Sequence, residues 1–466
     1  MKRIALPLGL ALILAVACTD RTPTAPDNSS LAPAATAEAS HKKPKLAGGP
    51  YEVGFTTFTI SDPSRDDRPI PVYVWYPADP AEIDGASPEA MYPLDPFHPG
   101  EFPDAPSSAF EAYGLDRAYQ EPTPAAGPFP LVLFTPGWGG TAYTDGHYVG
   151  TALAREGFVV AAVSNWGDQA TFHPEEPYDH LALAIYNRPR DVSFALDALL
   201  DRNSDQEALL FGSMNPAMIA ASGWSIGGYT AMVLAGGDDE VCDLADLFPG
   251  WPVPPETCVP SYPDPRISMI IPLDGSNQLL HFQELARVDV PAMGIGEEWA
   301  AVGDWQARQH AAFTGHPNYR VDVFNTNHFS FSNICIGWDV MVDYGVLPPD
   351  VADIWKSWYC TPGPLDGAEV RRIVTKYMLA FLQDYQPVLT PGHALTREPN
   401  VEFFVTEKRS PNSIDEDWPD LFTYFMHQPG REHANATPEA TALGVKDPLG
   451  ARPMEFAFRY LPRGNH

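Results

Sequence analysis

Gly223-Trp-Ser-Ile-Gly-Gly228 is the stretch that decides how this chain folds. It follows the small apolar run 218–221 and precedes Tyr229-Thr-Ala-Met-Val-Leu-Ala235, which is typical of a helix. A Gly-x-Ser-x-Gly sequence between a strand and a helix is the pattern of a nucleophile elbow, a sharp turn that exposes the serine hydroxyl. Glycine is needed on both sides because side chains there would collide with the neighbouring strand and helix. The pattern therefore predicts an α/β sheet with Ser225 at the end of one strand.

A serine hydroxyl is a weak nucleophile, so it needs an acid and a base. With this elbow the order along the chain is serine, then acid, then histidine. The apolar stretch 267–273 has the length of a strand, and Asp274 directly follows it. A carboxylate at the carboxyl end of a buried strand points into the crevice of an α/β sheet, so we expect Asp274 to be the acid. A turn-capping role is the alternative for Asp274, and Glu297 and Glu298 are alternative acids.

The base is sought after the last predicted strand. Residues 319–324 alternate in the manner of a strand, and His328 lies in the segment that follows. Three other histidines lie downstream of Ser225 in weaker contexts: His281 in an expected helix over 277–286, His310 in a second helical stretch, and His316 in a turn before Pro317. We therefore predict that His328 is the base.

Two backbone N–H groups are needed to stabilise an oxyanion. One is expected from Ile226, which follows the serine, and the other from Trp138 in the glycine-rich loop 135–140, after an apolar strand over 129–134. The loop lacks the lysine pattern of a phosphate-binding loop. Trp138 and Trp224 are also the expected walls of a substrate pocket, and a core position beneath the elbow is the alternative for Trp224.

The rest of the pattern alternates strands and helices. Two strand-like runs, 51–60 and 70–76, predict an opening antiparallel pair. Residues 77–128 are crowded with Pro and acidic residues and have no clear periodicity. Short apolar strands then alternate with helical stretches at 148–156, 189–200, 229–235 and 370–383. This is the pattern of a mainly parallel sheet that is covered on both faces.

Seven pieces of the chain occur in the order in which one hydrolase family has them: Val72-Tyr-Val-Trp-Tyr-Pro-Ala, Leu131-Val-Leu-Phe-Thr-Pro-Gly, Gly157-Phe-Val-Val-Ala-Ala-Val, Arg188-Pro-Arg-Asp-Val, Gly223-Trp-Ser-Ile-Gly-Gly, Pro272-Leu-Asp-Gly and Asn327-His-Phe-Ser-Phe. The chain thus resembles the platelet-activating-factor acetylhydrolase and dienelactone-hydrolase-like branch of the α/β-hydrolases. The resemblance implies the α/β-hydrolase fold, with Pro-rich and Cys-bracketed insertions. It also implies a serine carboxylesterase that acts through an acyl-enzyme, with Ser225, Asp274 and His328 as the triad. We expect short or compact acyl esters of small or lipid substrates, because an indole of Trp138 or Trp224 on the acyl side would narrow the slot, and we expect no cofactor or metal.

The chain departs from that branch at two positions. The acetylhydrolases usually carry His before the catalytic serine and before the glycine of the oxyanion loop, where this chain has Trp224 and Pro136. Gly-Trp-Ser-x-Gly-Gly also resembles the bacterial cutinase-like polyester hydrolases. A polyester hydrolase or lipase thus stays open, as does an amidase, since the same triad cleaves amides. A non-catalytic surface lipoprotein on a hydrolase scaffold is a further alternative.

The amino terminus has the features of an export signal. Lys2 and Arg3 precede a short apolar stretch that ends before Cys18, as in a bacterial lipoprotein signal. We expect a signal peptide over 1–18 with lipidated Cys18, a flexible linker over 19–49, a catalytic domain over 50–390, and an extension over 391–466 that packs on it. The protein is then anchored by lipid in a bacterial cell envelope, with plain secretion as the alternative.

The net charge and the cysteines limit the partners and the metals that this protein is expected to bind. The chain has 29 Lys and Arg against 60 Asp and Glu, a net charge of −31 with His neutral. Such a surface repels nucleic acid, so no nucleic-acid partner is expected, and membrane contact is expected only through the lipid. Cys242, Cys258, Cys335 and Cys360 allow three pairings, of which Cys242–Cys258 with Cys335–Cys360 is the simplest in an exported protein. Their long spacings disfavour zinc.

Overall fold

The computed structural model describes residues 49–98, 100–167, 181–238, 240–243, 253–297, 305–323, 326–360, 365–384 and 401–406. The expected signal peptide, Cys18, the linker and most of the C-terminal extension lie outside these residues. Within the described ranges, no helix combines the length and the apolar character that a membrane span requires.

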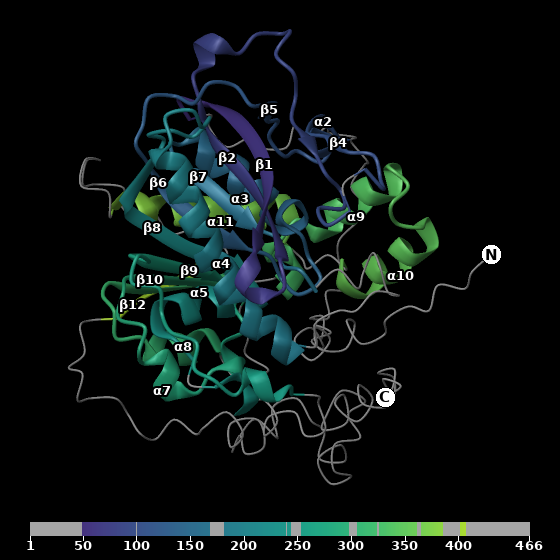
Figure 1. Ribbon diagram of the computed structural model, residues 1–466. Helices are drawn as coiled ribbons and strands as arrows, with labels where there is room; N and C mark the ends of the chain where they lie inside the picture. Colours follow the sequence, from purple (N-terminus) through teal and green to yellow (C-terminus); the bar gives the residue numbers. More distant parts are fainter. Residues whose placement is uncertain are drawn as a thin grey trace, which may run out of the picture.

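One large sheet organises the molecule (Figure 1). Its strands lie in the order β12-β11-β10-β9-β8-β6-β7-β2-β1-β5. Their bounds are β1 Glu52–Asp62, β2 Arg68–Ala78, β5 Tyr119–Gln120, β6 Phe129–Thr135, β7 Val159–Val163, β8 Met214–Trp224, β9 Met269–Leu273, β10 Ala292–Glu297, β11 Asn318–Val323 and β12 Val401–Thr406. A separate two-stranded sheet pairs β3 (Met91–Tyr92) with β4 (Ala105–Pro106).

The strand directions define the fold. The opening strands β1 and β2 are antiparallel, and β2 is antiparallel to β7. The six strands from β7 to β11 then run parallel to their neighbours. The chain passes from β6 outward to β7 and returns to place β8 on the other side of β6, so the strand order reverses beside β6. This order, with an elbow after β8, is that of the α/β-hydrolase fold, and it confirms the predicted fold class.

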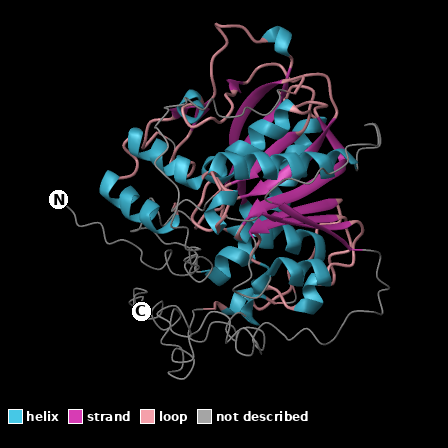
Figure 2. Ribbon diagram, turned by 180° about the vertical axis from the view of Figure 1, so that it is seen from behind, coloured by secondary structure: helices cyan, strands magenta, loops and turns pink. Residues whose placement is uncertain are grey.

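Helices cover both faces of this sheet, as Figure 2 shows from behind. One core cluster packs α3 (Ala142–Arg155), α9 (Ile334–Asp343), α10 (Pro349–Tyr359) and α11 (Gly367–Asp384) against one face. The other packs α4 (Leu181–Ser204), α5 (Ile226–Gly236), α7 (Phe282–Leu285) and the end of α8 (Trp305–Ala312) against the opposite face. The shorter elements are α2 Ser108–Glu111, η1 Pro63–Arg65, η2 Pro80–Glu82, η4 Val241–Asp243, η5 Pro255–Thr257, η6 Asn277–Leu279 and η7 His328–Phe331.

A helix forms at each of the four helical stretches 148–156, 189–200, 229–235 and 370–383, and each begins before its sequence pattern indicates, α3 and α4 by the largest margins. The helix expected over 277–286 is instead divided into η6 and α7. Helix α3 begins at Ala142 because Thr141 and Thr144 form a capping box there. Helix α4 runs through Pro189, where the sequence indicates a start. A proline removes one helical hydrogen bond, but the turn before Pro189 buries Ile185 in the core, and this packing stabilises the helix on that side.

His147 on α3 is a buried titratable group inside an aromatic cluster. Its ring stacks on Phe110, with centroids 4.5 Å apart, and meets Tyr92 and Trp75 edge to face. Neither ring nitrogen has a hydrogen-bond partner in the part of the chain that the structure describes. Burial lowers the pKa of His147 from its ordinary 6.5 to about 3. The folded protein therefore holds this imidazole neutral.

We predict that His147→Phe makes folding less sensitive to acid. Between pH 6.5 and about 3 only the unfolded chain binds a proton at this residue, so the native protein loses about 1.4 kcal/mol per pH unit as pH falls. The loss in free energy of unfolding between pH 7 and pH 5 should thus be about 2 kcal/mol smaller in the variant. Urea unfolding of both proteins at the two pH values measures this. Equal losses would show that His147 does not control acid sensitivity.

Candidate active site

The elbow at Ser225 is held by direct contact between backbones. A Cβ at Gly227 would lie 1.9 Å from the carbonyl oxygen of Thr135, and one at Gly223 would lie 2.5 Å from the same oxygen. The turn therefore sits against the end of β6, and only glycine fits on either side of it. Ser225 itself has φ 57° and ψ −119°, a backbone conformation that costs energy for any residue with a side chain.

Asp274 and His328 form a hydrogen-bonded pair. Asp274 follows β9, and its Oδ2 lies 2.5 Å from His328 Nδ1. Its Oδ1 accepts the backbone N–H of Glu297 at 3.3 Å, which orients the carboxylate. An ionised carboxylate only accepts hydrogen bonds, so Nδ1 carries the proton. His328 Nε2 is then the basic nitrogen; it is buried and has no hydrogen-bond partner among the described residues.

Short contacts link this pair to the elbow. The Ser225 N–H donates to the carbonyl oxygen of Leu273 at 3.0 Å, one residue before Asp274. The Trp224 Nε1–H donates to the carbonyl oxygen of His328 at 2.9 Å, and the two rings lie 4.8 Å apart. The Asp274–His328 pair therefore lies next to the elbow that carries Ser225.

The alternative acids and bases lie elsewhere or support the pair. Glu297 ends β10 and contacts Asp274 through its backbone, and Glu298 lies outside the described residues. His310 lies in α8, as expected, and His316 precedes Pro317. His281 caps the start of α7 instead of lying inside one continuous helix, since the chain forms η6 and then α7 around it.

The glycine-rich loop 136–140 lies on the elbow. A Cβ at Gly137 would lie 2.5 Å from the ring of Trp224, and Trp138 is 8% exposed. Ile226 is the first residue of α5, where backbone N–H groups have no acceptor within the helix. Trp224 is 1% exposed and packs beneath His328, so the structure places it in the core.

Sequence reasoning missed the two charged side chains that hold this loop. Arg188 on α4 donates to the carbonyl oxygens of Pro136 at 2.6 Å and Gly137 at 2.9 Å. Asp145 on α3 accepts the N–H of Gly137 at 2.7 Å. Burial raises the pKa of Asp145 to about 7, although the Gly137 N–H opposes that shift. For Arg188, the signal in the sequence is the segment Arg188-Pro-Arg-Asp191, which places a charged residue on the side of α4 that faces the sheet.

One group of described side chains has the spacing of a cation site. Ligand atoms of Asp95, His98 and Glu101 lie within 4.8 Å of one another. Asp95 also accepts the N–H groups of Phe97 and His98 and contacts the His98 ring at 3.0 Å. These bonds close a turn, and we assign no metal to it.

Comparisons with known proteins add little to this geometry. No protein-family model matches the chain, and no curated protein matches it. Among solved structures, the chain is similar to a ferulic acid esterase from Streptomyces cinnamoneus, with 21% identity and a TM-score of 0.49 over 78% of this chain and 99% of that one.

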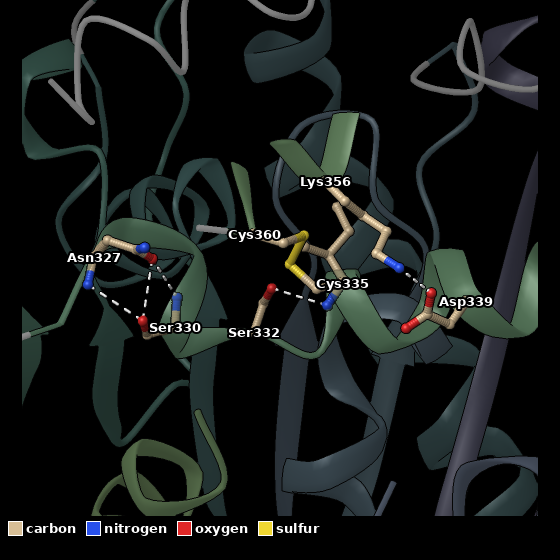
Figure 3. The surroundings of a disulfide bond; sticks show 8 residues. Asn327, Ser330, Ser332, Cys335, Asp339, Lys356 and Cys360 are labelled. Carbon is tan, nitrogen blue, oxygen red and sulfur yellow. Dashed lines mark hydrogen bonds and ion pairs between the residues drawn. A yellow bond between two sulfur atoms is a disulfide. The ribbon is translucent and has the colours of Figure 1, made fainter. Parts of the chain in front are cut away.

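Two disulfides join Cys242 to Cys258 and Cys335 to Cys360, the pairing expected from the sequence. Disulfides are typical of proteins that leave the reducing cytosol. The second bond links the start of α9 to the end of α10, and an ion pair between Lys356 and Asp339 links the same helices (Figure 3).

Helix α10 also touches the histidine loop. Tyr359, next to Cys360, packs on Phe329 with ring centroids 4.7 Å apart, and Phe329 follows His328. The Cys335–Cys360 bond therefore supports the segment that holds the base. In the described structure, the Cys242–Cys258 bond lies at η4 and η5, close to α4.

We predict that the two disulfides differ in their effect on the site. Replacing either pair by Ser should lower the free energy of unfolding, on the order of 3 kcal/mol for loops of this size. Only Cys335→Ser/Cys360→Ser should also reduce activity at the candidate site below the melting temperature, because Tyr359 then packs less firmly on Phe329. The Cys242→Ser/Cys258→Ser variant is the matched control. Thermal melts and activity at 25 °C test this; equal activity in both variants would contradict it.

Proposed function

We propose that this protein is a serine carboxylesterase that cleaves short or compact acyl esters through an acyl-enzyme. The observation that carries the proposal is the His328–Asp274 hydrogen bond beside the strained serine of the elbow. A base whose tautomer is set by a carboxylate, close to the serine of a nucleophile elbow, is the arrangement of acyl transfer.

In the proposed reaction, His328 Nε2 takes the proton of Ser225 as Oγ bonds to the ester carbonyl carbon. The carbonyl oxygen becomes negative and accepts hydrogen bonds from the N–H groups of Trp138 and Ile226. When the bond to the leaving oxygen breaks, His328 returns the proton and the alcohol departs. A water molecule, deprotonated by the same nitrogen, then releases the acid. Asp274 stabilises the imidazolium that forms in both steps.

The proposed substrate class rests on the glycine-rich loop 135–140, which lies on the elbow, and on the resemblance of the sequence to two groups of hydrolases. Both tryptophans are buried, with Trp224 1% and Trp138 8% exposed; we assign the acyl side to Trp138 because it lies on the loop that contacts the elbow. The ordered motifs favour the acetylhydrolase and dienelactone-hydrolase-like branch. Gly-Trp-Ser-x-Gly-Gly favours a cutinase-like polyester hydrolase as the second candidate.

We further propose that the protein works outside the cytosol, held by a lipid on Cys18. The two disulfides support export. The sequence before Cys18 supports the lipid anchor.

Ser225→Ala should abolish ester hydrolysis and labelling by a fluorophosphonate probe while the protein stays folded. The variant removes the nucleophile and leaves the glycine contacts of the elbow. Ser357→Ala, at an exposed position on α10, is the control and should react as the wild type does. Hydrolysis of p-nitrophenyl acetate and gel detection of the probe measure both. Normal turnover by Ser225→Ala would refute the mechanism.

Asp274→Asn and His328→Ala should each lower kcat by roughly 10³-fold or more. The two residues act as a unit, because the carboxylate works only through the imidazole. The double variant should therefore be little worse than either single one. Steady-state kinetics of the three variants test this coupling, and losses that multiply would mean that one residue has another role.

Trp138→Ala should shift chain-length preference towards longer acyl groups. The variant keeps the backbone N–H, and so most oxyanion stabilisation, while it opens the acyl side. Activity on acetyl and butyryl esters should fall modestly. A panel of p-nitrophenyl esters from acetyl to palmitoyl, with a polyester film as a separate substrate, measures the profile. An unchanged profile, or a wild type that already prefers palmitoyl esters, would contradict the assignment.

A further inference from the structure

Arg188 is a fully buried cation that the proposed chemistry does not use directly. It lies on α4, its exposed fraction is 0%, and its two terminal nitrogens reach the loop above the elbow. Burying a guanidinium is costly unless its N–H groups are bonded. Here two of them donate to consecutive carbonyl oxygens, those of Pro136 and Gly137. The planar fork of arginine suits two acceptors that are held side by side.

These two bonds set the direction of the peptide groups. In a trans peptide the C=O and the following N–H point to opposite sides. Since Arg188 holds the Pro136 oxygen, the Gly137 N–H points away from the guanidinium, and there it donates to Asp145 at 2.7 Å. Since Arg188 also holds the Gly137 oxygen, the Trp138 N–H likewise points away from Arg188.

Asp145 secures the loop from its other side. It is buried, and a Cβ at Gly140 would lie 2.2 Å from its Oδ2. The loop is thus closed around this carboxylate, with Arg188 on one side of the Pro136–Gly137 peptide and Asp145 on the other. The opposite charges of the two residues also attract, which lowers the cost of burying the carboxylate.

We propose that Arg188 and Asp145 are positioning residues that hold the Trp138 N–H in the direction needed to stabilise the oxyanion. The proposal rests on the proposed esterase function and deepens it. Stabilisation by a preformed donor requires that the donor be fixed before charge develops. Without these two contacts, a loop with three glycines would sample other peptide orientations.

The test compares two arginines that lie two residues apart on α4. Arg188→Met should lower kcat by roughly 100-fold, as loss of one oxyanion donor does, with little change in KM. Arg188→Lys should lower kcat as well, because one ammonium group cannot hold both carbonyl oxygens as the guanidinium does. Arg190→Met is the control, because Arg190 lies over the ring of Tyr186 and donates to the carbonyl oxygens of Tyr186 and Pro260, away from residues 135–140; its kcat should stay near that of the wild type. Active sites are counted first by fluorophosphonate titration, so that kcat is per folded site.

A second readout separates positioning from a merely structural role. A trifluoromethyl ketone forms a tetrahedral oxyanion on Ser225, whereas the matching methyl ketone binds mainly as a ground-state analogue. For the Arg188 variants, Ki of the trifluoromethyl ketone should rise in parallel with the loss of kcat/KM, and Ki of the methyl ketone should stay constant. Asp145→Asn, which keeps an acceptor for Gly137, should retain far more kcat than Asp145→Val.

Three results would overturn the proposal. The first is Arg188→Lys with the kcat of Arg190→Met. The second is a loss of activity fully explained by fewer titratable sites. The third is an unchanged Ki for the trifluoromethyl ketone. If Arg188→Met fails to fold, the proposal is decided by kcat of Arg188→Lys and by the comparison of Asp145→Asn with Asp145→Val. A wild type that neither hydrolyses esters nor reacts with the fluorophosphonate would instead refute the esterase function, before any variant is compared.

Discussion

The contact between the elbow and the carbonyl oxygen of Thr135 is the constraint on which the site depends. Three backbones meet there: the end of β6, the turn after β8, and the residues after β9, where a Cβ at Gly228 would lie 2.5 Å from the Cα of Gly275. Side chains at these glycines would separate the strands. With glycine in place, the carboxyl ends of β8 and β9 come close enough for Ser225 to bond with residues on both sides of Asp274.

The same constraint explains why the loop after β6 needs bracing from outside. It must lie against the elbow, so apart from Trp138 it consists of small residues and a proline, which have few side-chain atoms for contact. Its geometry is supplied instead by side chains from the two helical layers, Arg188 on α4 and Asp145 on α3. A buried charge is an expensive device for this purpose. Part of the cost is offset here, because both terminal nitrogens of Arg188 donate to carbonyl oxygens of the loop and Asp145 accepts one N–H from it.

The sequence predicts the parts of the site that depend on local pattern. A few neighbouring residues are enough to recognise each of these parts: the elbow, the strand before Asp274 and the strand before His328. The fold class follows from the order of these parts along the chain. The disulfide pairing follows from short separations. Contacts across the fold are different: Arg188 and the oxygen that it holds are 52 residues apart, and no periodicity connects them. The sequence pattern places the start of α4 at Pro189, because proline favours the first turn of a helix. Burial of Ile185 in the core outweighs this local preference, so the helix begins earlier.

Trp224 shows how the structure narrows an assignment that the sequence leaves open. A tryptophan beside the nucleophile could form the pocket wall or the core. Its indole is 1% exposed, lies 4.8 Å from the His328 ring, and donates to the His328 carbonyl. A side chain with these contacts fixes the histidine loop and has little surface left for a substrate. Trp138, 8% exposed on the loop that Arg188 holds, is then the residue proposed both to donate its N–H to the oxyanion and to limit acyl length. Changes in the bracing of this loop should therefore affect turnover and chain-length preference together.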